Sequence, residues 1–402
     1  MTSHASRLTD EMLQKPADFS LVLGGPLFQI FRRCHLADDG LEMLRRRVMI
    51  LSLIGWLPLL LLAAMEGHLL GGVAVPFLFD AEAQVRFLVA LPLLIVAELV
   101  VHQRMRFVVQ QFRERQLIPA AAEERFEAIV RSELRLRNSV WAEVLLIVFV
   151  YVVGVFGVWR HYIALTAPTW YAVPTSAGPE FSITGLWYSY VSLPLYQFLM
   201  LRWYFRLFIW AKFLWQVSRI PLQLVPTHPD RVGGLGFLSG IAYAFMPLAA
   251  AHGAMLAGLL ASRIFHAGAA LPQFKIEIAV LLVFLIAVVF GPLLVFTGQL
   301  AHAKRTGARE YGTLAQRYVR EFDAKWLRGG APAEEALVGS ADIQSLADLA
   351  NSYEVVRGMQ LAPITRDALL RVGVATLAPL VPLALTMMSL EELIKQLIGI
   401  VF

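Results

Sequence analysis

Two ionisable residues stand in one of the most apolar stretches of this sequence. Glu98 and His102 lie four residues apart, within and directly after the run Phe87–Val101, and that spacing places both on one face of a helix. Arg202 stands in a second apolar run, Trp187–Phe205. Ionisable side chains at membrane depth are costly unless they pair or meet water, so they commonly mark ion or proton pathways.

The depths of Glu98 and Arg202 match if both runs cross a membrane in the same direction. At about 1.5 Å per residue from the outer end, Glu98 lies about 18 Å deep and Arg202 about 22 Å deep. One interpretation is a structural ion pair, with Arg206 reaching toward the interface. The other makes Glu98 and His102 part of a proton or ion path. We expect Glu98 and Arg202 to lie within hydrogen-bonding distance.

The stretch 226–236 reads PTHPDRVGGLG and carries a second group of polar residues. His228, Asp230 and Arg231 could bind an anion or a metal at the cytoplasmic mouth of a helix bundle. Asp230 could equally accept hydrogen bonds from the start of the next helix, as Asp does at many helix N-termini. The sequence leaves both interpretations open.

The last apolar run, Val372–Leu390, contains Thr376 and Thr386, and Glu391 and Glu392 follow it. Hydroxyls and prolines are tolerated where a helix lines a cavity or is covered by neighbours. If copies of this helix met around an axis, the two glutamates would form an acidic ring that favours cations. The alternative is an ordinary buried last helix.

Metal chemistry has little support in this sequence. His252, Glu66, His68 and Glu277 are conceivable as an outer cluster, but they are unlinked in the chain. Counting along the helix places His252 about 25 Å from the inner face, too far from Glu98 to share a metal with it.

Recognised enzyme motifs are absent from the sequence. The single cysteine, Cys34, excludes an internal disulfide and a cysteine-rich metal cluster. No GxxxxGK[ST], HExxH, GxSxG or CxxC pattern occurs, so a recognised NTPase, zincin or hydrolase is not supported. The sequence therefore predicts no enzyme and no nucleic-acid partner, and it leaves cofactor and metal unknown.

The composition is that of a membrane protein. Hydrophobic residues make up 58% of the 402 residues and charged residues only 16%, whereas soluble domains carry about 25% charged residues. A helix needs roughly 20 apolar residues to cross the bilayer. We therefore predict an all-α polytopic protein with about seven spans. The runs are Val48–Ala64, Phe87–Val101, Val140–Trp159, Trp187–Phe205, Leu235–Ala261, Ile276–Thr297 and Val372–Leu390.

Lysines and arginines gather in alternate loops, which predicts a cytoplasmic N-terminus and an outer C-terminus in a bacterial inner membrane. Residues 1–47 would form the cytoplasmic N-terminus, with an interfacial helix within Phe19–Leu36. Six spans and a basic loop, 102–139, would occupy 48–299. A cytoplasmic helical subdomain, 300–371, would precede the seventh span and C-terminus, 372–402.

The fourth span continues as an apolar helix through 206–225. An apolar surface of that size is normally hidden by protein or by a membrane surface. We predict that Leu207–Leu224 is helical and is covered by the subdomain 300–371. The covering side chains that we expect are Leu314, Tyr318, Phe322 and Trp326.

Three segments, HPDRVGGLGFL, EFDAKWLRG and SADIQSLADLANSYEVV, resemble a family of uncharacterised bacterial multi-pass membrane proteins. The resemblance implies a membrane location and no particular activity. The layout of seven spans with long cytoplasmic helices is similar to that of seven-helix ligand-gated ion channels of the insect chemoreceptor type. That similarity implies an oligomer whose last helix lines a pore.

The leading hypothesis is a homo-oligomeric, ion-channel-like transport protein of the lipid bilayer, with an unidentified small ion or small-molecule ligand. A secondary transporter that uses Glu98 and His102 is the first alternative. The second is a membrane enzyme or sensor with a cytoplasmic site at His228 and Asp230.

Overall fold

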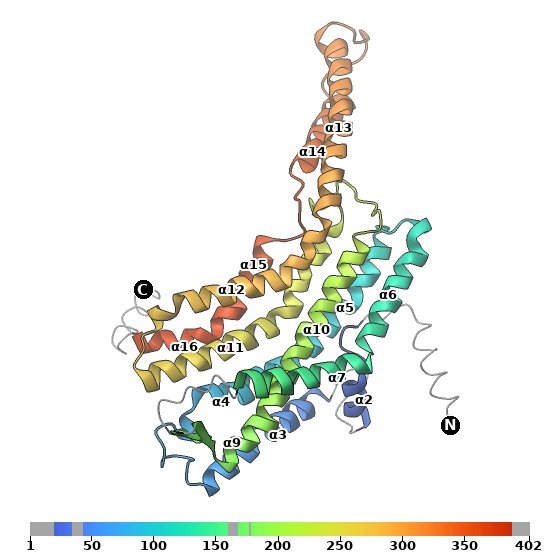
Figure 1. Cartoon of the computed structure of the whole chain (residues 1–402). Coiled ribbons are helices and arrows are strands. Elements are labelled where there is room, and N and C mark those ends of the chain that lie inside the picture. Colours follow the sequence, from blue (N-terminus) through green and yellow to red (C-terminus); the bar gives the residue numbers. More distant parts are fainter. Residues whose placement is uncertain (1–19, 34–42, 160–167, 177, 388–402) are drawn as a thin grey trace, which may run out of the picture.

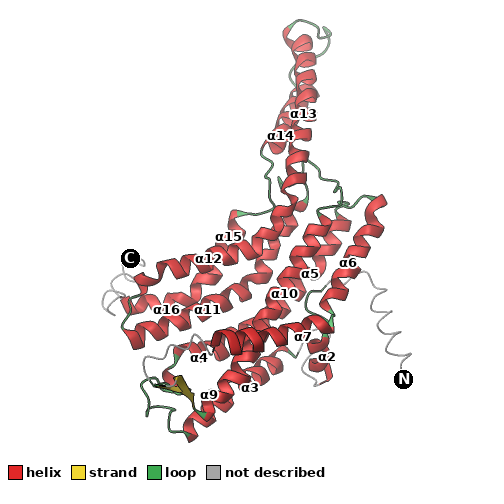
Figure 2. Cartoon of the chain, in the orientation of Figure 1, coloured by secondary structure: helices red, strands yellow, loops and turns green. Residues whose placement is uncertain are grey.

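The computed structural model describes residues 20–33, 43–159, 168–176 and 178–387, and these residues are almost entirely helical (Figure 2). The sheet in this described part is a two-stranded antiparallel hairpin of β1 (Ala172–Thr175) and β2 (Gly178–Phe181). The structure therefore confirms the all-α class.

Most of the long helices consist of consecutive pieces, in which short 3₁₀ or π-helical turns (named η) join α-helical segments. In chain order the helical pieces are α2 (Pro26–Arg33), α3 (Leu44–Met65), η1 (Phe77–Phe79), α4 (Ala81–Val85), η2 (Arg86–Ala90), α5 (Leu91–Glu114), η3 (Ala120–Ala122), α6 (Glu123–Arg137), α7 (Val140–Phe149), η4 (Val150–Trp159), α9 (Ile183–Trp187), η5 (Tyr188–Ser192), α10 (Leu193–Val217), η6 (Leu235–Gly240), α11 (Ile241–Ala267), η7 (Leu271–Phe274), α12 (Lys275–Phe290), η8 (Gly291–Phe296), α13 (Thr297–Phe322), η9 (Asp323–Leu327), α14 (Ala341–Arg357), α15 (Arg366–Leu377), η10 (Ala378–Leu380), α16 (Val381–Ala384) and η11 (Leu385–Met387).

Six continuous helices in the described residues are long and apolar enough to cross a membrane, as in a multi-pass membrane protein. They coincide with six of the seven predicted runs. The other predicted run lies within the continuous helix Ile183–Val217, which is not among the six. Its Tyr, Trp, Ser and Gln residues make it less apolar, and many of its side chains are buried against neighbouring helices. The six are Leu44–Met65, Ala81–Glu114, Val140–Gly157, Leu235–Ala267, Leu271–Leu327 and Arg366–Ala384.

Helix α5 occupies the middle of the bundle, where it contacts α3, α10 and α11 (Figure 1). On its other side, α11 contacts α15 and α12. Small residues permit this close packing. A methyl group added at Gly253 of α11 would lie 1.9 Å from the carbonyl oxygen of Thr376 in α15. Any side chain at Gly253 would therefore push these two helices apart.

Helices α13 and α14 form an antiparallel hairpin that projects from one end of the bundle (Figure 1). At its far end, the Tyr318 hydroxyl donates to the carbonyl of Asp342 over 3.0 Å, and Trp326 Nε1 donates to the carboxylate of Asp342 over 2.9 Å. At its base, Lys304 Nζ donates to the carbonyl of Met359 over 2.8 Å. The hairpin is thus held together by contacts between its own two helices.

The prediction that this hairpin covers the helix Leu207–Leu224 is wrong. Helix α10 ends at Val217, and the hairpin extends away from it, leaving the Leu314 side chain 50% exposed. Phe213 of α10 instead packs edge-on against Phe112 of α5 and also contacts α6. The loop between the second and third predicted spans therefore folds back as α6 and supplies the apolar surface that we had assigned to the hairpin.

Candidate functional site

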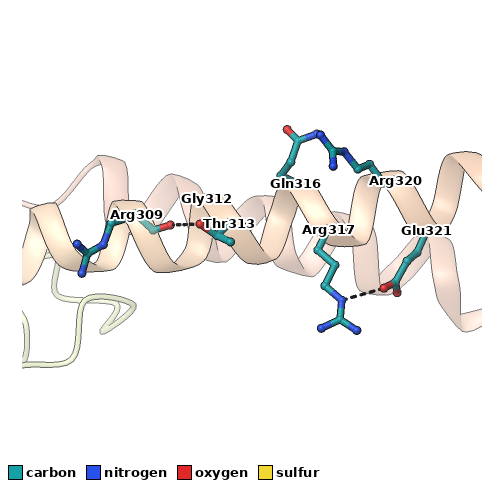
Figure 3. Close-up of a pocket in the computed structure, with 7 residues that line it drawn as sticks. All are labelled: Arg309, Gly312, Thr313, Gln316, Arg317, Arg320 and Glu321. Carbon is teal, nitrogen blue, oxygen red and sulfur yellow. Dashed lines mark hydrogen bonds and ion pairs between the residues drawn. The ribbon is translucent and has the colours of Figure 1, made fainter.

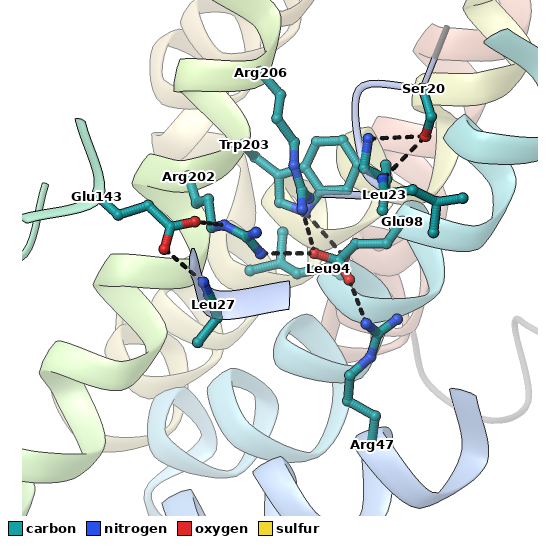
Figure 4. A network of polar contacts seen from close by, with 11 residues as sticks. Ser20, Leu23, Leu27, Arg47, Leu94, Glu98, Glu143, Arg202, Trp203 and Arg206 are labelled. Carbon is teal, nitrogen blue, oxygen red and sulfur yellow. Dashed lines mark hydrogen bonds and ion pairs between the residues drawn. The ribbon is translucent and has the colours of Figure 1, made fainter. Parts of the chain in front are cut away.

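A buried cluster of charges surrounds Glu98 in the centre of the bundle (Figure 4). Its Oε1 accepts from Arg206 Nη2 at 2.6 Å and from Arg202 Nη1 at 3.3 Å, both on α10. Its Oε2 accepts from Arg47 Nη1, on α3, at 3.0 Å. Helices that are distant in the sequence therefore meet at one carboxylate.

A second carboxylate, Glu143 of α7, extends this cluster. Its Oε1 lies 3.1 Å from Arg202 Nε, so Arg202 bridges the two acids. Its Oε2 accepts from the backbone N–H of Leu27 at 2.7 Å. The two acids and the three arginines that pair with them all have side chains at most 8% exposed. Removing one partner would leave an uncompensated buried charge, which is strongly destabilising.

The segment Ser20–Arg33, which we call the cover segment, closes one side of the charged cluster. The Ser20 hydroxyl lies 2.9 Å from His102 Nδ1. The backbone N–H of Gly25 donates to Asn138 Oδ1 over 3.0 Å, and Arg137 donates to the carbonyl of Ser20. The described part of the predicted interfacial segment therefore packs onto the middle of α5 and onto the junction of α6 and α7.

Glycine lets the cover segment approach the acids. Gly25 has φ +88°, a left-handed conformation that residues with a side chain rarely adopt. A Cβ at this position would lie 3.1 Å from Glu143 Oε1 and 3.7 Å from Arg202 Nη2. The preceding residue, Gly24, has φ +136°. This pair of glycines is what allows the backbone to turn directly over the charged cluster.

Helix α10 is held in register with α5 at the level of the cluster. Trp203 Nε1 donates to the carbonyl of Leu94 over 2.9 Å. The guanidinium of Arg206 lies 4.7 Å from the centre of the Trp203 ring, within the range of a cation–π contact. Because Arg202 and Arg206 are one turn apart on this fixed helix, both can reach the same carboxylate.

The predicted contact between Glu98 and Arg202 is confirmed, but it is one part of a larger cluster. The prediction that Arg206 reaches toward the interface is wrong, because Arg206 is buried and makes the shortest contact to Glu98. Arg47 and Glu143 were not predicted as members of the cluster. Glu143 had a usable signal, since it is the one acid in the apolar helix VWAEVLLIVF. The sequence gives no signal that Arg47 belongs to the cluster, because it is part of a run of three arginines that the positive-inside rule already explains.

Asp230 organises the loop between α10 and η6. Its Oδ1 accepts from the backbone N–H of Val232 at 2.9 Å and of Gly234 at 3.1 Å, and its Oδ2 accepts from Gly236 at 2.8 Å. Burial acts to raise the pKa of Asp230, but these three hydrogen bonds outweigh burial and hold the pKa below its ordinary value. This geometry matches the interpretation of Asp230 as a backbone acceptor at a helix start.

The two other residues of the predicted mouth lie around Asp230. His228 Nδ1 is 2.9 Å from Asp230 Oδ1. Arg231 has a left-handed backbone with φ 56°, and its carbonyl accepts from the N–H of Gln360 at 2.7 Å. The structure thus brings His228, Asp230 and Arg231 together in a turn that joins the loop to the base of the α13–α14 hairpin.

The predicted pore residues fall partly within the described chain. Thr376 is buried, donates to the carbonyl of Val372 over 2.8 Å and packs against α11. Thr386 is exposed and donates to the carbonyl of Leu383 over 2.6 Å. Glu391 and Glu392 lie outside the described residues.

His252 and Glu66, which were proposed as members of an outer cluster with His68 and Glu277, have separate partners. The Tyr204 hydroxyl lies 2.6 Å from His252 Nε2, and His252 Nδ1 lies 2.8 Å from the carbonyl of Leu248. The Glu66 carboxylate accepts from the hydroxyl of Thr184 at 2.5 Å. Among the residues described, no group of three or more His, Cys, Asp and Glu side chains could hold a metal.

A second polar feature lies on the exposed face of the hairpin, along α13 (Figure 3). It is an open groove along one helix, crossed by an ion pair of 2.9 Å between Arg317 and Glu321. Its lining residues are Arg309, Gly312, Thr313, Gln316, Arg317, Arg320 and Glu321.

Comparison of the chain with models of protein families, with curated proteins and with solved structures finds no match.

Proposed function

We propose that this chain is a membrane transport protein that moves a small ion past the Glu98 cluster in the manner of a secondary transporter. The observation that carries the proposal is a charged cluster buried inside one chain whose helices can cross a membrane. Buried ion pairs are a weak source of stability, and apolar residues often replace them without loss. Ionisable residues within membrane spans commonly serve ion or proton movement.

The cover segment supports a pathway that opens and closes. Its polar contacts to the rest of the site are a few separate hydrogen bonds, made by Ser20, Gly25 and Leu27. Gly24 and Gly25 can change backbone conformation at little steric cost. Movement of the cover segment would expose Glu98 and Glu143 to one side of the membrane.

His102 offers a way to couple this movement to a proton. The Ser20 oxygen already accepts from the N–H groups of Val22 at 3.2 Å and Leu23 at 3.0 Å. Its hydroxyl therefore donates to His102 Nδ1, which requires an unprotonated Nδ1. A proton on that nitrogen would replace an acceptor by a donor and break the contact. His102 lies one turn from Glu98 on α5, and its partner Ser20 also accepts from Arg137, so its proton would act inside a charged environment.

Purified protein in proteoliposomes tests the proposal directly. Gradients of chloride, sodium and potassium are imposed in turn, with a pH-sensitive dye inside the vesicles. We expect one ion to move together with a pH change, and we expect His102→Gln to abolish that pH change. Glu127→Gln, which alters an exposed ion pair with Arg113, serves as the control and should match the wild type. Absence of ion movement in the wild-type vesicles would overturn the proposal.

Movement of the cover segment has its own test. Val22 is 1% exposed, so Val22→Cys in a Cys34→Ser background should react slowly with a membrane-impermeant maleimide. We expect labelling to accelerate when the transported ion and a pH gradient are present. Equal labelling rates under all conditions would show that the cover segment does not open.

A second candidate function is the oligomeric, channel-like pore. The observation that favours it is the projecting α13–α14 hairpin, whose exposed Leu314, Val319 and Leu327 suit contacts between copies. In that version Thr376, Thr386, Glu391 and Glu392 would lie near the shared axis. Native mass spectrometry and planar-bilayer recordings distinguish the two. A multimer with stepwise single-channel currents supports the pore, whereas a monomer with proton-coupled flux supports the transporter.

A further inference from the structure

The guanidinium of Arg47 is only partly used by the ion cluster. Nη1 contacts Glu98 at 3.0 Å, but Nε and Nη2 have no hydrogen-bond partner in the described part of the chain. The Arg47 side chain is 1% exposed. Buried N–H groups in native proteins are almost always paired, and each unpaired one is costly. A ligand for these two N–H groups is therefore implied.

Arg47 lines a small enclosed cavity together with Glu98. The cavity leaves about 10 Å³ for the centre of a water-sized particle, which is room for about one small particle. Apolar side chains form most of the wall, among them Phe31, Leu51 and Leu199. This size suits one monatomic ion or one water molecule better than sulfate, phosphate or a carboxylate.

The charge of the surroundings selects an anion for this cavity. Three guanidinium groups, those of Arg47, Arg202 and Arg206, face the two carboxylates of Glu98 and Glu143. Positive charge is therefore in excess: by one among these five ion-paired residues, with the guanidinium of Arg137 close to Arg202 and Arg206 in addition. Both oxygens of Glu98 already accept from arginines, so its negative charge is paired within the cluster. In a low-dielectric interior, an unbalanced charge is far more costly than in water.

We infer that the cavity beside Arg47 binds one small monatomic anion of the halide class, held by Nε–H and Nη2–H of Arg47. This inference deepens the proposed transport function, since it names the substrate class of the same site. Phe31 of α2 forms part of the cavity wall, and the Arg47 guanidinium lies 5.7 Å from the centre of its ring. The bound anion would therefore be released only when the cover segment moves.

Chloride-35 NMR on purified protein in detergent tests binding without requiring transport. Wild-type protein should broaden the chloride line, and bromide should compete the broadening away. Arg47→Lys keeps the positive charge but removes the paired donors, and we expect it to bind chloride at least about tenfold more weakly, a loss of about 1.4 kcal/mol. Leu51→Phe leaves Arg47 in place and fills the cavity, and it should have the same effect. Arg46→Lys, at an exposed neighbouring position, is the matched control.

The outcomes separate this inference from the proposed function. The site is supported if the wild type and Arg46→Lys bind chloride saturably and both cavity variants lose this binding. The cavity variants must also melt at the wild-type temperature, which shows that they are folded. No competable broadening in the wild type would mean that a water molecule fills the cavity, and it would overturn the inference. Chloride binding without flux in proteoliposomes would leave the site standing and remove the transport function. Flux of a cation without chloride binding would overturn the anion site and leave the transport function standing.

Discussion

The Glu98 cluster and the α13–α14 hairpin hold their charges in opposite ways. In the cluster, Arg206 and Glu98 are 108 residues apart in sequence and are almost completely buried. In the hairpin, Lys325 pairs with Glu335 and Asp342, which are 10 and 17 residues away, and all three side chains are at least 31% exposed. The cluster therefore depends on the whole fold, whereas the hairpin depends mainly on its own two helices. Substitutions at the two regions should differ accordingly.

Loss of Glu98 should produce the largest effect. Glu98→Gln leaves Arg47, Arg202 and Arg206 without their shared carboxylate, and removing one partner of a buried ion pair costs about 3–5 kcal/mol. We expect the free energy of unfolding in detergent to fall by that amount. The control Glu127→Gln, in a partly exposed pair, should change it by less than about 1 kcal/mol. Equal effects of the two substitutions would contradict the view that burial makes the cluster critical.

The same contrast extends to two glycines. A Cβ at Gly253 would lie 1.9 Å from the carbonyl of Thr376, but one at Gly312 in the hairpin would lie 3.7 Å from Tyr353, an ordinary contact. Gly253→Ala should therefore force α11 and α15 apart and destabilise the fold by about 1–3 kcal/mol. Gly312→Ala should be neutral or stabilise the hairpin by up to about 1 kcal/mol, because Ala favours helix over Gly. Thermal melts of both variants would test these two predictions. Destabilisation by Gly312→Ala would contradict the contrast between the bundle and the hairpin.

The sequence predicts the parts of this molecule that follow from composition and depth. Apolar run lengths predict six of the membrane-length helices, and counting residues from the outer end predicts the contact of Glu98 with Arg202. Depth says nothing about rotation around a helix axis, so it could not bring Glu143 to Arg202. The contacts of the cover segment could not be predicted either, because most of them are made by backbone groups, those of Ser20, Gly25 and Leu27.

The error about α10 has a related cause. The apolar composition of 206–225 indicates that Phe213 needs a buried environment, but not which segment provides it. Phe126 lies in a loop that is rich in arginine and glutamate, and it packs against Phe213. The prediction chose the hairpin instead, because its apolar residues recur at helical spacing and the two segments could bury each other. Composition therefore predicts that a surface is covered, whereas the choice of the covering segment requires the tertiary structure.

Asp230 is intermediate between the two regions, since it is local in sequence but partly buried. Asp230→Asn keeps the shape and removes the charge that three backbone N–H groups stabilise, so we expect a loss of about 1–2 kcal/mol at neutral pH. The pKa of Asp230 in the folded chain lies below its ordinary value. Its contribution is therefore complete above about pH 4 and is lost as the pH falls through the folded-state pKa. Melting temperatures of the two proteins should converge under acid, and a constant difference down to pH 2 would contradict this account.

Asp342 in the hairpin should show the smallest effect on the whole molecule. Lys325 and Trp326 both donate to its carboxylate, and these hydrogen bonds lower its pKa. The pair is exposed to solvent and water can replace either partner, so Asp342→Asn should leave the main melting transition unchanged. The first turn of α14 should nevertheless open more often, because Asp342 ties it to η9. Hydrogen exchange followed by mass spectrometry should show severalfold faster exchange in that turn and unchanged protection around Glu98. If protection around Glu98 also fell, the hairpin and the buried cluster would be coupled, and their stabilities could no longer be treated as independent.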